Sequence, residues 1–252
     1  MAYRHMAYYY DQLMKDAPYD KWINFTTSVF ENYQQPIKLV ADLGCGTGEI
    51  TTRLAKQNYH MYGVDYSSDM LTCADQKAQH KQVQVEWLKQ DLRALTGLEG
   101  LDAVISYCDV INYMTSEADL NNVFQRIYHS LSPEGIFIFD VHSLNYVNNF
   151  LTNNTFAHVT DDFSYIWFCV EGEANGEIYH ELTFYAQADQ DKFIRFDESH
   201  HQRTYPPLFY KQLLSHIGFE SIHVHTDFSL NEQHLNEDAD RIFFIAEKGS
   251  RS

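Results

Sequence analysis

Three glycines and one acidic residue have the types and the spacing of a site for a nucleotide-like ligand. Gly44, Gly46 and Gly48 follow the apolar run 39–41, and Asp65 ends a second short apolar run further along the chain. Glycines between a strand and a helix let the backbone approach a ligand closely, and a carboxylate at the next strand end can accept hydrogen bonds from both hydroxyls of a ribose. The pattern therefore predicts a strand–loop–helix–strand unit that holds such a ligand at its strand ends.

The residue at position 49 decides between classes of ligand. A dinucleotide-binding loop requires G-x-G-x-x-G, but Glu49 stands where the third glycine belongs, and a carboxylate there would repel a pyrophosphate. The phosphate-binding pattern G-x-x-x-x-G-K-[ST] is absent from the sequence as well. One alternative stays open, in which the loop is only a glycine-rich turn between a strand and a helix.

The run DLGCGTGE over residues 42–49 resembles motif I of the class I S-adenosylmethionine-dependent methyltransferases. S-adenosylmethionine carries a sulfonium, an ammonium and a carboxylate group but no phosphate. A loop flanked by Asp42 and Glu49 therefore suits it electrostatically. The resemblance implies that S-adenosylmethionine is the cofactor.

The resemblance also implies roles for residues outside the loop. Tyr10 and Trp22 would form part of a lid over the methionine end of the cofactor, although Trp22 also fits the core-facing side of an amphipathic helix. The Asp91 carboxylate would accept a hydrogen bond from the adenine amino group and the Leu92 N–H would donate one to a ring nitrogen, but a helix N-cap explains Asp91 equally well. The complete set implied for cofactor binding is Tyr10, Trp22, Gly44, Cys45, Gly46, Gly48, Asp65, Tyr66, Met70, Asp91, Leu92 and Asp109.

Polar residues after the fourth and fifth expected strands are candidates for binding a methyl acceptor. In the family, the loop after the fourth strand borders the transferring methyl group, which points to Asp109, Asn112 and Tyr113; the alternative is that these side chains only bond loop backbone. His142 and His200 are the best-placed bases by residue type, because an imidazole titrates near pH ~6.5. The sequence identifies no catalytic residue, and the candidates for substrate binding are Asn112, Tyr113, His142, His200 and Arg203.

Short apolar runs alternate with amphipathic helical segments along most of the chain, which predicts a doubly wound α/β sheet. The resemblance implies the class I methyltransferase fold, a seven-stranded and mostly parallel sheet with a terminal antiparallel hairpin. Residues 37–141 and 206–252 would form the cofactor-binding core, and residues 1–36 would form an N-terminal helical lid.

Between residues 142 and 205 the pattern changes to period-2 alternation, with antiparallel strands expected near 164–170, 177–188 and 192–201. In related methyltransferases an insertion of this kind caps the active site and selects the substrate. The alternative is a scaffold or a homo-oligomer interface, because flat antiparallel ribbons readily pair with one another.

Composition and charge exclude several classes of partner. The 252 residues include 18 Lys and Arg against 35 Asp and Glu, a formal net charge of −17, and nucleic-acid binding relies on Lys and Arg to neutralise phosphates. We therefore expect no nucleic-acid partner. No apolar run approaches the length of a membrane span, so we expect a cytoplasmic protein without a membrane partner. The four cysteines form no C-x-x-C pair, which predicts reduced thiols and no metal site.

Together these observations predict transfer of a methyl group from S-adenosylmethionine to O, N or S of a small soluble acceptor. Because the sulfonium methyl group is already activated, alignment of the acceptor would be the main task of the protein. Two other functions stay open. One is a non-catalytic S-adenosylmethionine-binding sensor or assembly protein, and the other is a nicotinamide-dependent oxidoreductase, against which Glu49 counts.

Overall fold

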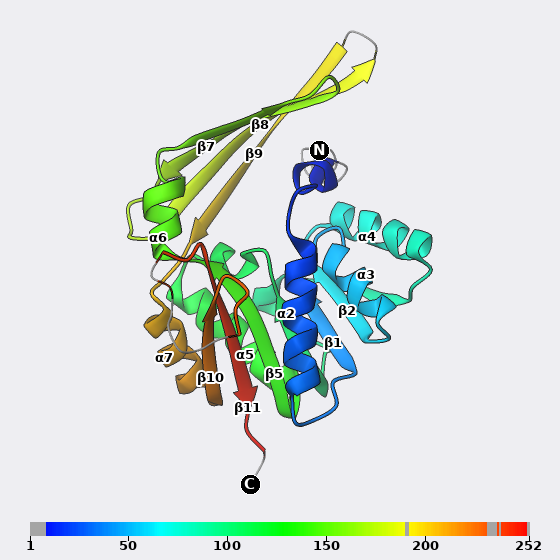
Figure 1. Ribbon diagram of the computed structural model, residues 1–252, viewed down its shortest axis with the longest axis vertical. Coiled ribbons are helices and arrows are strands. Elements are labelled where there is room, and N and C mark those ends of the chain that lie inside the picture. The colour runs from blue at the N-terminus through cyan, green and yellow to red at the C-terminus, as the bar shows by residue number, and fades with distance from the viewer. Residues whose placement is uncertain (1–8, 190–191, 231–235, 237, 251–252) are drawn as a thin grey trace.

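The computed structural model describes residues 9–189, 192–230, 236 and 238–250, which form two β-sheets and the helices packed around them (Figure 1). The larger sheet has seven strands in the order β10-β11-β5-β4-β1-β2-β3. β11 runs antiparallel to both β5 and β10, whereas the other neighbouring strands pair in parallel. The predicted fold class is thereby confirmed. The strands are β1 (Leu39–Leu43), β2 (His60–Asp65), β3 (Val85–Lys89), β4 (Leu101–Ser106), β5 (Leu131–His142), β10 (Phe219–Thr226) and β11 (Arg241–Lys248).

Helices cover both faces of this sheet, because successive strand residues alternate between two apolar clusters. Val40 and Ile138 belong to the cluster that α2 and α3 cover, while Ala41 and Phe139 belong to the cluster that α5 and α7 cover. None of the helices in the described ranges is long and apolar enough to cross a membrane. The helices around the sheet are α2 (Tyr19–Asn32), α3 (Glu49–Lys56), α4 (Ser68–Lys81), α5 (Glu117–Ser130) and α7 (Pro207–Ile217).

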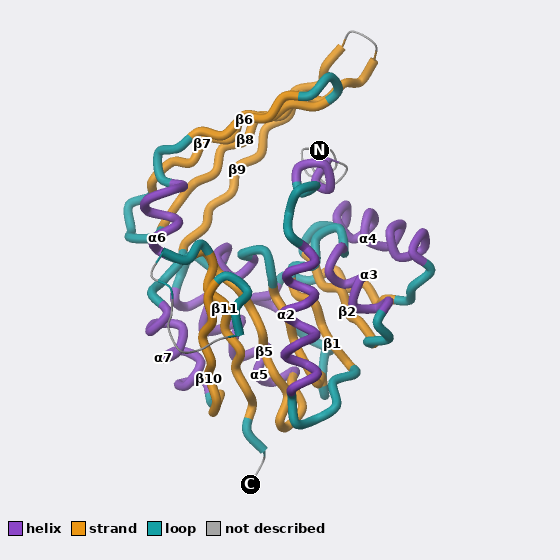
Figure 2. The backbone as a smooth tube through the Cα atoms, viewed as in Figure 1, coloured by secondary structure: helices purple, strands orange, loops and turns teal. Residues whose placement is uncertain are grey.

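The second sheet is an antiparallel meander in the order β6-β7-β8-β9, and it projects beyond the ends of the core strands (Figures 1 and 2). All four strands lie within the predicted insertion 142–205. The sequence predicted three of them but not β6, an edge strand whose residues are mostly exposed and therefore lack an apolar alternation. The helical turns before β6 were not predicted either. These elements are α6 (Leu144–Tyr146), η3 (Val147–Leu151), β6 (Thr155–Val159), β7 (Phe163–Glu171), β8 (Glu177–Asp189) and β9 (Lys192–Arg203).

The first described residues lie between the second sheet and the glycine loop. Residues 9–13 are helical, and the Tyr9 ring stacks on Phe163 of β7 with ring centroids 5.2 Å apart. The Asp11 carboxylate accepts a hydrogen bond of 2.6 Å from the Thr47 hydroxyl in the loop. This segment therefore connects the two parts of the fold, while residues 1–8 of the predicted lid lie outside the described residues.

Candidate active site

The glycine loop joins β1 to α3 through three positive φ angles. φ is +76° at Gly44, +53° at Gly46 and +71° at Gly48, a region that residues with a side chain rarely adopt. A Cβ atom on Gly44 would also lie 2.4 Å from Cγ1 of Val110, whereas one on Gly46 would have only the Tyr10 ring, at 3.9 Å, among its close described neighbours. Gly46 therefore presents its backbone to the open side of the loop, beside Tyr10, where a ligand can approach.

Asp65 ends β2 and faces this loop. Its Oδ2 accepts a hydrogen bond from the Gly46 N–H at 2.9 Å, and its Oδ1 accepts one from the Ser67 N–H at 2.8 Å. Burial raises the pKa of the Asp65 carboxyl although these backbone donors oppose the shift. Each oxygen retains a second lone pair, so the carboxylate fits the two vicinal hydroxyls of a ribose.

Three further residues of the predicted cofactor set surround the same corner. The Cys45 N–H donates to the Val64 carbonyl at 3.0 Å, which holds the loop against β2. Tyr66 leaves 67% of its surface exposed. The Met70 N–H is capped by the Ser67 hydroxyl at 3.3 Å, and the Met70 side chain packs against the apolar cluster of the second sheet. Met70 thus places the second sheet beside the cofactor loop.

The two acids that flank the loop differ in their surroundings. Asp42 is buried beneath the loop and accepts a hydrogen bond of 2.6 Å from the Thr51 hydroxyl, and burial raises its pKa to about 7. Burial would also raise the pKa of Glu49, but hydrogen bonds from Arg53 and Lys81 outweigh it and lower that pKa to about 2. The charge of Glu49 is therefore balanced by neighbouring cations, and the electrostatic fit expected from Glu49 at the loop is weaker than the sequence indicated.

Asp91 caps a short helical turn, η1 (Leu92–Ala94). Its carboxylate accepts a hydrogen bond from the Arg93 N–H at 2.9 Å and pairs with the Arg93 guanidinium at 2.6 Å. The Leu92 side chain packs in the core. The capping role is thus observed, and contacts of Asp91 and Leu92 with an adenine remain a prediction.

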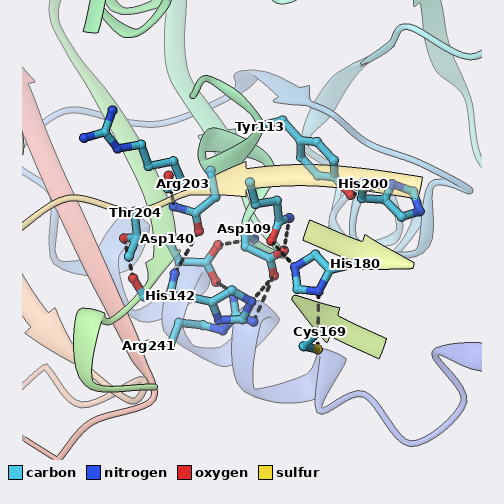
Figure 3. Close-up of polar contacts among 12 residues, drawn as sticks. Asp109, Tyr113, Asp140, His142, Cys169, His180, His200, Arg203, Thr204 and Arg241 are labelled. Atoms are coloured by element: carbon cyan, nitrogen blue, oxygen red, sulfur yellow. Dashed lines mark hydrogen bonds and ion pairs between the residues drawn. The ribbon is translucent and has the colours of Figure 1, made fainter. Parts of the chain in front are cut away.

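A buried ion-pair network lies where β4, β5 and β11 meet (Figure 3). The chain leaves β4 through Cys108 and Asp109, which adopt φ angles of +57° and +55°, a conformation that residues other than glycine hold only when their surroundings enforce it. The Asp109 N–H donates to Oδ1 of Asp140 at 3.1 Å. Arg241 pairs with both carboxylates, at 2.9 Å from Asp140 and 3.1 Å from Asp109, and so fixes the loop after β4.

Trp22 supports this network from the core side. Its indole N–H donates to Oδ2 of Asp140 at 2.9 Å, and the Arg241 guanidinium lies 5.2 Å from the ring centroid. Only 3% of Trp22 is exposed. This placement matches the core-packing alternative for Trp22, whereas Tyr10 lies at the open side of the glycine loop.

A chain of hydrogen bonds links the second sheet to Asp109. The Trp167 indole N–H donates to Nδ1 of His180 at 3.0 Å. Because an indole can only donate, Nδ1 of His180 carries no proton. The ring proton of this neutral imidazole is therefore on Nε2, which acts as the donor. Nε2 of His180 lies 3.1 Å from Oε1 of Gln202, and the Gln202 amide donates to Oδ2 of Asp109 at 2.8 Å. Every donor in the chain therefore points toward Asp109. Burial opposes ionisation of Asp109, but Arg241 and the Gln202 hydrogen bond lower its pKa.

His142 approaches the same carboxylate from the end of β5. Its Nε2 lies 3.4 Å from Oδ1 of Asp109. Its Nδ1 is buried and has no hydrogen-bond partner in the described part of the chain. Burial lowers the pKa of His142 to about 4. The imidazole is therefore neutral near pH 7 and is a weak base.

The other predicted substrate residues separate into two groups. Tyr113 and His200 face each other, with the tyrosine hydroxyl 3.2 Å from Nδ1 of His200. Asn112 is buried and bonds backbone, because its amide donates to the Arg203 carbonyl at 3.0 Å and its carbonyl accepts from the His142 N–H at 3.0 Å. The Arg203 guanidinium lies 4.5 Å from the Tyr205 ring centroid and points away from Asp109 (Figure 3). The structure thus brings Tyr113, His142 and His200 toward Asp109, but not the Arg203 side chain.

Several residues of this site carried no role in the sequence-based prediction. Asp140 closes the apolar run of the fifth strand, and an acid at the end of a buried strand was a usable signal. His180, Gln202 and Arg241 had no such signal, because their contacts depend on how the second sheet and β11 are placed.

Comparison with known proteins agrees with this geometry. A family model described as a methyltransferase domain matches residues 40–135. A protein of Geobacillus sp. (strain WCH70), named provisionally as a methyltransferase, is 38% identical over 249 residues, which cover 98% of this chain and 100% of that protein. A glycine/sarcosine N-methyltransferase from Halorhodospira halochloris is 26% identical over 229 residues, or 84% of this chain and 76% of that protein.

Among solved structures, an S-adenosylmethionine-dependent methyltransferase from Clostridium acetobutylicum ATCC 824 superposes with a TM-score of 0.88 at 25% identity, over 99% of this chain and 100% of that chain. The similarity to methyltransferases thus extends over nearly the full length of this chain. The chain therefore belongs to the class I S-adenosylmethionine-dependent methyltransferases, and S-adenosylmethionine is its cofactor.

Proposed function

We propose that this methyltransferase modifies a nucleophilic O, N or S of a small acceptor bound between the glycine loop and the inner face of the second sheet. The inner face is the side of β7, β8 and β9 that carries Trp167, His180, His200 and Gln202. One observation carries the proposal most directly. The hydrogen bonds from His180 through Gln202 to Asp109 hold this face at the loop after β4.

The chemistry needs alignment more than it needs an acid or a base. Bound S-adenosylmethionine supplies an electrophilic methyl group, whose carbon–sulfur bond breaks with its electron pair left on sulfur as an acceptor lone pair forms the new bond. Gly46 and Asp65 would hold the ribose end of the cofactor. Tyr113 and His200 would orient the acceptor, since positioning alone can contribute roughly 7–11 kcal/mol.

His142 has a positioning role in this proposal. With a pKa of about 4, its imidazole removes a proton from an acceptor poorly near pH 7. The unpartnered Nδ1 of His142 can accept a hydrogen bond, while its Nε2 faces Asp109. His142 would therefore steady a hydroxyl or amino group of the acceptor.

The same contacts indicate which part of the chain would perform which function. Residues 37–141 and 206–252 would bind the cofactor, the insertion 142–205 would cap the acceptor, and residues 1–36 would contribute the lid through the segment that carries Tyr10. We favour a cap over an oligomer interface because Gln202 on β9 bonds directly to Asp109. The glycine/sarcosine N-methyltransferase relative supports a small acceptor by its name.

The test is a screen of small alcohols, amines and thiols with methyl-labelled S-adenosylmethionine. For an acceptor that is methylated, Tyr113→Phe and His200→Ala should lower transfer at least about tenfold, the effect of losing one oriented hydrogen bond to a reacting group. Both variants should keep the affinity for S-adenosylhomocysteine. Arg203→Ala is the matched control, because its guanidinium lies over Tyr205. Binding of S-adenosylhomocysteine without transfer to any compound would contradict the proposal.

A further inference from the structure

Glu198 occupies the inner face of the second sheet between Phe196 and His200. β9 pairs antiparallel with β8, and Glu198 lies opposite Leu182. Side chains alternate across a strand, so Glu198 shares its face with His200, whereas the neighbouring Asp197 points to the opposite, exposed face. Along the strand, Glu198 thus lies about 7 Å from His200.

One oxygen of the buried Glu198 carboxyl group, Oε1, has no hydrogen bond within the described residues. Only 6% of the residue is exposed, and Oε1 has no hydrogen-bond partner in the part of the chain that the structure describes. Burial raises the pKa of Glu198. The other buried acids of the site are satisfied differently, since Asp42 is bonded by Thr51 and Asp140 by Trp22 and Arg241. A buried carboxyl oxygen without a hydrogen bond is costly, and a ligand could supply the missing donor to Oε1.

The neighbours of Glu198 indicate what kind of ligand this is. On one side the Phe196 ring stacks on Phe184 and Tyr9, with centroid distances of 4.9 Å and 5.9 Å. On the other side His200 lies against the Tyr113 hydroxyl, and burial lowers the pKa of this imidazole, so that it is neutral near pH 7. A carboxylate between aromatic rings and a neutral imidazole favours a cation, because both the charge and the ring faces attract it.

We propose that Glu198 binds an ammonium group of the methyl acceptor, which makes the acceptor a small amine. The methylated atom is then a different nucleophile of the same molecule, because a protonated nitrogen has no lone pair to attack the methyl group. The inference rests on the proposed function, because it places Glu198 in the acceptor site described above. The net charge of −17 supports it, because a strongly acidic protein attracts cationic ligands. Glu198 acts here as a specificity-determining residue that holds the acceptor.

The experiment compares amines with neutral molecules of the same shape. Binding of phenethylamine and 2-phenylethanol, hexylamine and 1-hexanol, and putrescine and 1,4-butanediol is measured by calorimetry with the protein saturated in S-adenosylhomocysteine. In the wild-type protein we expect at least one amine to bind about tenfold or more tightly than its alcohol, as a charge-assisted hydrogen bond implies. Glu198→Gln should reduce this preference to within about twofold. Asp197→Asn removes an adjacent carboxylate on the outer face and should preserve the preference.

The outcomes separate this inference from the proposed function. Equal binding of amines and alcohols, absence of amine binding, or a preference that survives Glu198→Gln overturns the role of Glu198. Methylation of neutral acceptors by such a protein would leave the proposed function in place. Glu198→Gln should also unfold at a higher temperature than the wild type without ligand, because the charge of a buried carboxyl group is removed, and a lower unfolding temperature would count against the unpartnered state of Oε1.

Discussion

Asp42 shows how one buried carboxyl group can make stability depend on pH. Its pKa rises from 3.8 to about 7, so between these values the native state holds a proton that the unfolded state has lost. The free energy of unfolding therefore falls as the pH rises from about 4 to about 7. The shift corresponds to roughly 4 kcal/mol at ~1.4 kcal/mol per pH unit.

The Asp42→Asn variant isolates this effect, because asparagine does not titrate and can still accept the Thr51 hydrogen bond. We expect the stability of the wild type relative to Asp42→Asn to decline by up to roughly 4 kcal/mol over that pH range. Urea unfolding of both proteins at several pH values measures the difference. A difference that is constant with pH would show that Asp42 does not titrate in this range.

Asp65 carries the sharpest residue-level prediction about the cofactor. Asp65→Ala removes both ribose acceptors and should weaken S-adenosylmethionine binding by at least ~1.5 kcal/mol, the lower range for hydrogen bonds to charged groups. Calorimetry on the folded variant measures the change. Asp75→Ala is the control, because that exposed carboxylate on α4 bonds Gln79. Unchanged affinity in a folded Asp65→Ala protein would remove Asp65 from the cofactor site.

At the residue scale, the sequence located Asp65 beside the glycine loop, but it did not show that cations surround Glu49. Asp65 accepts hydrogen bonds from the Gly46 N–H in the loop, 19 positions earlier, and from the Ser67 N–H, two positions later, so one short stretch of the chain determines its position. Glu49 is neutralised in part by Lys77 and Lys81 on α4. Those contacts arise from the packing of α3 against α4, which residue spacing alone does not define.

The glycine loop is the element whose geometry is most sensitive to substitution. Gly44→Ala combines a positive φ with a Cβ 2.4 Å from Val110, whereas Gly97→Ala has φ of +74° and no described atom within 4 Å of its Cβ. Gly97→Ala should lose roughly 1–2 kcal/mol of stability through the backbone alone. Gly44→Ala should lose at least ~1 kcal/mol of stability more than Gly97→Ala, because its Cβ overpacks against Val110. It should also bind S-adenosylmethionine more weakly. Denaturant unfolding measures the stability of both variants. Equal losses of stability would show that the Val110 side chain moves aside at no energetic cost.

The link between β9 and the loop after β4 should contribute measurable stability. Gln202→Ala leaves the His180 Nε2–H and Oδ2 of Asp109 without their bridging partner, which costs about 1–3 kcal/mol. Ser199→Ala is the control, because its hydroxyl bonds Glu181 on the exposed face and should change stability by less than ~0.5 kcal/mol. Urea unfolding and hydrogen exchange of β9 amides measure both. Similar effects of the two substitutions would mean that the chain of hydrogen bonds does not hold the second sheet.

At the element scale, the sequence predicted the strands and helices whose apolar residues recur with a regular period. The strands and helices of the core follow alternating or helical apolar spacing, and Ser67 and Ser116 cap the starts of α4 and α5. β6 was missed because it is short, exposed and at the edge of its sheet. The sequence also could not show which side of β9 faces the core. A shift of one residue in the pairing with β8 would turn Asp197 inward in place of Glu198.

Charge is a property of the whole molecule and supports a prediction about partners. With a net charge of −17, the protein should not bind duplex DNA or RNA in about 50 mM salt, where phosphate contacts are strongest. Fluorescence anisotropy of labelled duplexes tests this, with a basic nucleic-acid-binding protein as the positive control. Salt-sensitive binding at micromolar protein would reveal a local basic surface and overturn the exclusion of nucleic acid.

The candidate site as a whole could be predicted only in part. The proposed cofactor half comes from residues 42–65, a continuous stretch, and a motif describes it. The acceptor half combines Asp109, Gln202 and Arg241, which meet across 93 and 132 positions of sequence. Such contacts depend on strand order and on the placement of the second sheet, and neither leaves a local pattern in the chain.

The position of β11 has a consequence for how this protein is made. Of the seven core strands β11 is synthesised last, yet it inserts between β5 and β10 and brings Arg241 to Asp109 and Asp140. While the chain emerges from the ribosome, the cofactor loop can form with β1 and β2, but the loop after β4 lacks this arginine until residue 241 has been added. A nascent chain that already contains motif I therefore still lacks the arginine that pairs with Asp109 and Asp140, and this ion-pair network forms only after β11 has been made.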